Sequence, residues 1–73
     1  MTSPYENLAN AIILQAVKDY RYARHKLRKN PNNAKAKAEI NECERFFLSD
    51  WFGVLTNLDG EILLQKLKQE DTI

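Results

Sequence analysis

The 73 residues predict a single all-α domain, 1–73, in which a long helical hairpin is closed by two shorter helices. Apolar residues recur at three- and four-residue steps along most of the chain, which is the spacing of one face of a helix. No stretch alternates between apolar and polar residues over more than four positions, and only two glycines and two prolines are present to form tight turns. The helices are expected at about 4–29, 33–48, 50–57 and 59–69.

The first expected helix starts with a capping sequence. Ser3 would accept the backbone N–H of Glu6, whose carboxylate would reach back to the serine N–H, and a proline occupies the first helical position. Pro31 disfavours helical geometry at the residue before it, so the helix should end near Lys29. Its inner stripe is expected to consist of Leu8, Ile12, Ala16, Tyr20, Ala23 and Leu27, widened by Ile13 and Val17.

The second expected helix follows the turn at 30–33, which is built from three asparagines and one proline. Asn33 is the expected cap, and the alternative is Asn30 with Pro31 at the first helical position. The inner stripe of this helix is expected to be Ala36, Ile40, Cys43 and Phe47.

The third and fourth expected helices have caps of their own. Ser49 can cap a short helix over about 50–57, although the second helix could instead continue through Ser49 without a break. Asp59 is the expected cap of the last helix. Its apolar face is expected to be Ile62, Leu63 and Leu67, broadened by Leu64.

Length and cysteine content exclude several classes of protein. A multidomain enzyme does not fit in 73 residues, and Cys43 has no partner for a disulfide, which favours a reducing compartment and so the cytoplasm. A transmembrane helix needs about 20 consecutive apolar residues, whereas the longest uninterrupted run is the four residues 11–14. No membrane association is therefore expected. No secretory signal is expected either, since no lysine or arginine precedes Lys18.

Catalytic and metal-binding patterns are also missing. His25 and Cys43 are the only soft metal ligands, and one of each cannot close a zinc site within the chain. No glycine loop that could cradle a phosphate is present. The sequence therefore predicts no enzyme, no cofactor, no metal and no small-molecule substrate.

The clearest feature is an uneven distribution of charge. Residues 18–37 hold eight basic side chains and one acidic one, a net charge of +7, whereas residues 38–73 hold three basic and eight acidic, a net charge of −5. Lys35 and Lys37 fall in the first turn of the second helix, where positive charge is disfavoured. The segment is either a solvated face or a site for nucleic acid or another anion. The candidate anion-binding residues are Lys18, Arg21, Arg24, Arg28, Lys29, Lys35 and Lys37.

A cluster of aromatic residues is the second feature, with four aromatic side chains in 46–52. They are expected to form the hub where the two short helices close on the hairpin. The alternative is that one or two stay exposed and anchor a partner. The candidate interface residues are Phe46, Trp51 and Phe52.

The run 44–52, followed by Leu55-Thr56 and 58–60, resembles a pattern in small uncharacterised helical proteins encoded by phages, prophages and integrative elements of Gram-positive bacteria. Asp19-Tyr20-Arg21 and Asn30-Pro31 are similar to the same group, so the resemblance spans about 11–67. It implies an accessory protein of a mobile element and brings no residue roles.

Together these features predict a small helical protein that acts by binding. A protein partner or a second copy, giving a homodimer, is favoured because the net charge is only +1 and no recognisable nucleic-acid motif is present. The alternative is a nucleic-acid-associated accessory protein that uses the basic segment at the hairpin tip.

Overall fold

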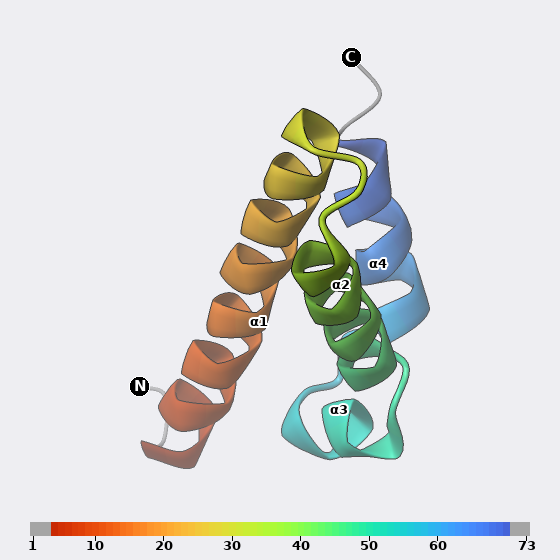
Figure 1. Cartoon of the computed structure of the whole chain (residues 1–73). Coiled ribbons are helices and arrows are strands. Elements are labelled where there is room, and N and C mark those ends of the chain that lie inside the picture. Colours follow the sequence, from red (N-terminus) through yellow and green to blue (C-terminus); the bar gives the residue numbers. More distant parts are fainter. Residues whose placement is uncertain (1–3, 71–73) are drawn as a thin grey trace.

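The computed structural model describes residues 4–70, apart from the side chains of Tyr5 and Glu6, and it confirms the all-α prediction. Within these residues the chain forms four helices and no strand (Figure 1). They are α1 (Pro4–Lys29), α2 (Ala34–Phe47), α3 (Asp50–Leu55) and α4 (Gly60–Gln69).

The four helices form an elongated molecule of 43 × 22 × 22 Å. Helices α1 and α2 make the hairpin, α4 packs mainly on α2, and α3 lies across the end where α2 stops (Figure 1). The α1–α2 turn is at one end of the long axis, and the N-terminal half of α1 and α3 are at the other (Figure 1). No helix in the described part of the chain has the length and apolar character needed to cross a membrane.

Local side-chain caps set the helix boundaries. The Asn33 side-chain oxygen accepts the Ala36 N–H at 3.0 Å, so Asn33 caps α2 as predicted and the Asn30 alternative is wrong. The Asp59 carboxylate accepts the N–H groups of Glu61 and Ile62 at 2.9 and 3.4 Å, which confirms the cap of α4. The predicted Ser3 cap lies outside the described residues.

Ser49 separates α2 from α3, which settles the alternative that the sequence left open. Its hydroxyl donates to the Phe46 carbonyl at 2.7 Å and accepts the Phe52 N–H at 3.3 Å, while its own backbone is extended. Helix α3 ends at Leu55, two residues before the predicted end, because Thr56 takes an extended conformation.

The buried face of α1 differs from the predicted stripe. Ala9, Ile13 and Val17 are buried, whereas Leu8 is 61% exposed and Ile12 is 37% exposed. Helix α1 has 26 residues and α2 has 14, so the N-terminal part of α1 extends past the end of α2. Helix α3 is the neighbour there and lies against a different flank, so the buried stripe is turned by about one residue, 100°.

A single core joins the helices. Phe47 of α2 lies edge-on to Tyr20 of α1, with ring centroids 6.0 Å apart, and to Phe52 of α3 at 5.9 Å. In α4 the buried residues are Leu64 and Leu67, whereas Ile62, expected on the inner face, is exposed. The complete cluster of buried residues is Ile13, Val17, Tyr20, Phe47, Phe52, Leu64 and Leu67.

Candidate functional site

The arginines of the predicted basic site are engaged within the molecule. The Arg21 guanidinium donates from Nε and Nη2 to the two carboxylate oxygens of Glu70, at 2.9 and 2.7 Å. This forked pair links α1 to the residue that follows α4, and the bond to Glu70 raises the pKa of Arg21. Arg21 therefore has a carboxylate partner within the molecule, on an exposed part of its surface.

Arg24 belongs to a polar network around a fully buried tyrosine. Its Nη1 donates to the Tyr20 hydroxyl at 3.1 Å and its guanidinium lies 5.4 Å from the Tyr20 ring centroid. The Tyr20 hydroxyl in turn donates to Glu44 Oε2 at 2.9 Å, and Lys68 Nζ is 3.9 Å from the same oxygen. Burial and the bond to Glu44 raise the pKa of Tyr20 to about 12. The network connects α1, α2 and α4.

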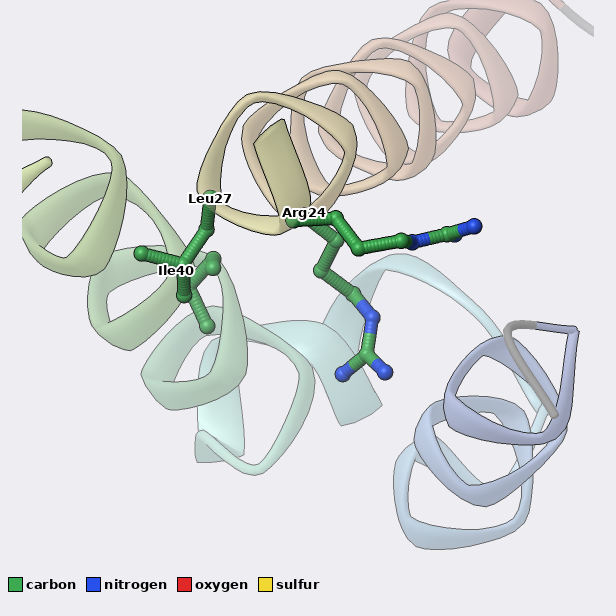
Figure 2. Close-up of a pocket in the computed structure, with 4 residues that line it drawn as sticks. Arg24, Leu27 and Ile40 are labelled. Atoms are coloured by element: carbon green, nitrogen blue, oxygen red, sulfur yellow. The ribbon is translucent and has the colours of Figure 1, made fainter. Parts of the chain in front are cut away.

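A shallow groove of about 380 Å³ lies beside this network. Figure 2 shows Leu27 of α1 and Ile40 of α2 approaching one another, with Arg24 leaving α1 next to them. Arg28 completes the lining, and both arginines interact with other residues of the chain. The groove is thus an apolar floor edged by guanidinium groups that already have partners.

The lysines differ from the arginines. All four lysines among the candidates are exposed, and within the described residues none of their side chains forms a hydrogen bond or an ion pair: Lys18, Lys29, Lys35 and Lys37. Tyr22 lies on the same helix as two of them, is exposed, and has Lys26 Nζ 4.5 Å from its ring centroid. The first turn of α2 contains no acidic residue, as the sequence indicated.

The three candidate interface aromatics have different environments. Trp51 is 58% exposed on α3. Phe46 is half-buried, with its ring 5.7 Å from that of Phe52. Phe52 is 1% exposed, so its assignment to an interface is wrong. The break at Ser49 turns α3 so that Phe52 points into the core, while Trp51 stays outside.

Exposed large apolar side chains gather at one end of the molecule. Nine are present in the described residues, and Tyr22 is the one that lies elsewhere. The others belong to the N-terminal half of α1 and to α3 with its flanking loops, at the end opposite the α1–α2 turn, or to the first turn of α4, which begins nearer the middle of the long axis (Figure 1). We call this group the apolar end; it consists of Leu8, Ile12, Leu14, Leu48, Trp51, Val54, Leu58 and Ile62.

The apolar end carries acidic residues and no basic ones. Residues 7–17 contain no charged side chain, and residues 46–65 contain Asp50, Asp59 and Glu61 but no lysine or arginine. All three acidic residues are exposed. A groove of about 280 Å³ separates α1 from the end of α3 here, lined by Asn10, Val54, Leu55, Thr56 and Asn57.

Sequence reasoning identified Trp51 but placed Leu8, Ile12 and Ile62 in the core. The unequal lengths of the two long expected helices already indicated that part of the first helix would be left uncovered. The predicted first helix exceeds the predicted second by about ten residues, or roughly 15 Å, so its far end could not be covered by the second.

Cys43 and His25 do not form a reactive pair. The thiol is half-buried between α1 and α2, and burial together with the nearby carboxylates of Asp19 and Glu39 raises the pKa of Cys43. His25 is exposed, and no hydrogen bond joins the two residues. Among the described residues, no group of three or more His, Cys, Asp or Glu side chains could hold a metal ion.

Comparisons with known protein families, with characterised proteins and with solved structures found no match. The fold and surface still define a class: a small all-α protein with an apolar, acidic end and exposed lysines towards the other end.

Proposed function

We propose that this protein acts by binding another protein through its apolar end, without catalysis. The observation that carries the proposal is the gathering of eight of the nine exposed large apolar side chains at that end. Single exposed leucines are ordinary on a small domain, whereas apolar side chains concentrated on one surface are typical of interaction sites. Trp51 is the expected anchor, because tryptophan is over-represented among the residues that dominate binding energies.

We also propose a cellular location and a genomic origin for the protein. A cytoplasmic location is supported by the unpaired thiol of Cys43. A role as an accessory protein of a mobile genetic element is supported by the resemblance carried by 44–52 and 55–60.

The test is a selection from a random peptide library against the immobilised protein. Peptides that bind the wild type are then measured against Trp51→Ala and against Tyr22→Ala, whose side chain is similarly exposed at 62% but lies outside the apolar end. We expect Trp51→Ala to weaken binding by about 30-fold or more, the size of a hot-spot effect, and Tyr22→Ala to leave it unchanged. The absence of any selected peptide, or equal losses in the two variants, would contradict the proposal.

A second candidate function is binding of nucleic-acid phosphates by the exposed lysines. It is favoured by one observation, that within the described residues the side chains of Lys18, Lys29, Lys35 and Lys37 have no partner, while the three arginines do. Fluorescence anisotropy with labelled DNA at several salt concentrations tests it. Four phosphate contacts predict a slope of log affinity against log salt of about −3.6, and each Lys→Gln change should reduce it by about one. No binding at low salt would rule this function out.

A further inference from the structure

The apolar end is negatively charged, which favours a positively charged partner. Asp50 and Glu61 lie in the first turns of α3 and α4, and Asp59 caps α4, so all three carboxylates flank the exposed side chains of Trp51 and Leu58. The nearest basic residues along the chain are Arg45 and Lys66, outside this segment. A partner that covers the apolar side chains would therefore meet negative charge at the edge, which favours lysine or arginine opposite.

The exposed side chains follow helical spacing on both elements. Leu8 and Ile12 are four residues apart on α1, and Trp51 and Val54 are three residues apart on α3. Neighbouring rows of this kind pack against the rows of another helix. The described residues contain no strand, so no sheet edge is offered to an extended peptide, whereas a helical partner satisfies its own backbone hydrogen bonds.

A second copy of this chain is a poor occupant. In a two-fold symmetric dimer through the apolar end, the same patch meets itself, so Asp50, Asp59 and Glu61 would approach their own counterparts. The basic part of the chain offers little apolar surface in exchange, since Tyr22 is the one exposed large apolar side chain outside the apolar end in the described residues. The charges thus favour a different molecule.

We infer that the apolar end binds a basic amphipathic helix of a partner protein. The apolar face of that helix would cover the row of Trp51 and Val54 and the row of Leu8 and Ile12. Its lysines or arginines would lie opposite Asp50 and Glu61. This inference rests on the proposed function and adds the chemistry of the partner to it.

The experiment uses two designed helical peptides of about 18 residues, or five turns, with leucines at identical positions. One carries lysine and the other glutamate at the polar positions, and both are titrated into the full chain while the emission of Trp51, the sole tryptophan, is recorded. We expect the lysine peptide to shift the emission to shorter wavelength and to bind at least about tenfold more tightly than the glutamate peptide. Its affinity should fall as salt is added.

A pair of matched variants tests whether the acidic residues of the apolar end strengthen binding of the lysine peptide. Glu61→Gln and Glu42→Gln remove the same charge from an exposed position, at the apolar end and in the middle of α2 respectively. We expect the first to raise the Kd of the lysine peptide by about two- to fivefold and the second to leave it unchanged. Unfolding curves of both variants check that the fold is intact.

The outcomes separate the inference from the function on which it rests. Equal binding of the two peptides, lost in Trp51→Ala, would keep the apolar end as a binding surface and overturn the basic-helix inference. Failure of both these peptides and the selected library peptides would overturn both. Growth of the mass to twice 8.5 kDa by light scattering, without any peptide, would show that a second copy is the occupant and would also overturn the inference.

Discussion

Tyr20 is a fully buried side chain with a polar group that must be hydrogen-bonded. It is fully buried, yet its hydroxyl has both a donor and an acceptor partner, in Arg24 and Glu44. A buried hydroxyl without partners costs free energy, whereas a satisfied one holds its neighbours in a unique arrangement. Tyr20 thus does more than fill space, since it fixes how α1 meets α2 and leaves Glu44 close to Lys68 of α4.

Removing the Tyr20 hydroxyl should destabilise the fold. We expect Tyr20→Phe to lower the free energy of unfolding by about 1–2 kcal/mol, because the Glu44 carboxylate and Arg24 each lose a hydrogen-bond partner in a part-buried position. Urea unfolding measures the change. Tyr22→Phe, at an exposed hydroxyl on the same helix, is the control and should change stability by less than about 0.5 kcal/mol.

The raised pKa of Tyr20 also predicts a pH dependence. The folded protein holds the phenol neutral up to about pH 12, whereas the unfolded chain ionises it near 10. The unfolded state therefore binds fewer protons between these values, so the contribution of Tyr20 to stability is constant below pH 10 and falls as the pH rises to 12. The stability difference between wild type and Tyr20→Phe should shrink over this window. A constant difference in urea unfolding would contradict the assigned environment.

At the scale of elements, the capping residues made the helix boundaries predictable. Asn33, Ser49 and Asp59 each accept backbone N–H groups two or three residues ahead, so the information needed is local to the sequence. The face that α1 buries was not predictable in the same way. It depends on where α2 stops and which flank α3 meets, and this decides that Ile13 is buried and Ile12 is not.

The junction of α2 and α4 depends on a glycine. A β-carbon on Gly60 would lie 1.8 Å from the carbonyl oxygen of Phe47, so the start of α4 approaches α2 more closely than any side chain allows. Gly53 of α3 is different, because a β-carbon there meets nothing within 4 Å.

The two glycines therefore predict opposite results for the same substitution. Gly60→Ala should destabilise the protein by about 1–3 kcal/mol, as overpacked sites do, because the ends of α2 and α4 must separate. Gly53→Ala should stabilise it by up to about 1 kcal/mol, through the higher helix propensity of alanine. Thermal or urea unfolding of both variants checks this. A neutral Gly60→Ala variant would mean that the two helix ends are not in close contact.

At the scale of the whole molecule, the chain separates two kinds of surface along a 43 Å axis. The apolar end has acidic charge at its edge, and the opposite half carries the unpaired lysines. The charge segregation could be predicted, because it is a property of the linear sequence. The engagement of Arg21 with Glu70, 49 residues away, could not, because it depends on where α4 ends in space. The exposure of Trp51 was the alternative that the sequence left open, whereas Leu8 was placed in the core.

The acidic character of the apolar end predicts how Trp51 responds to ionic quenchers. Because its side chain is 58% exposed and Asp50 precedes it, the quenching constant of caesium relative to that for free tryptophan should exceed the corresponding ratio for iodide at low salt. The preference should fade as salt screens the carboxylates. Stern–Volmer titrations measure it, and Asp50→Asn should reduce it. A higher ratio for iodide than for caesium would show that positive charge reaches this surface.

Two-dimensional amide NMR of the full chain, recorded during titration with the lysine peptide, tests whether the apolar end is the binding surface and takes a basic helix. We expect shift changes concentrated in 7–14 and 48–62, with the amides of α2 around Ala36 and of the lysines that flank the α1–α2 turn unaffected. Changes centred on the turn or spread evenly over α1 and α2, or no changes at all, would contradict this expectation.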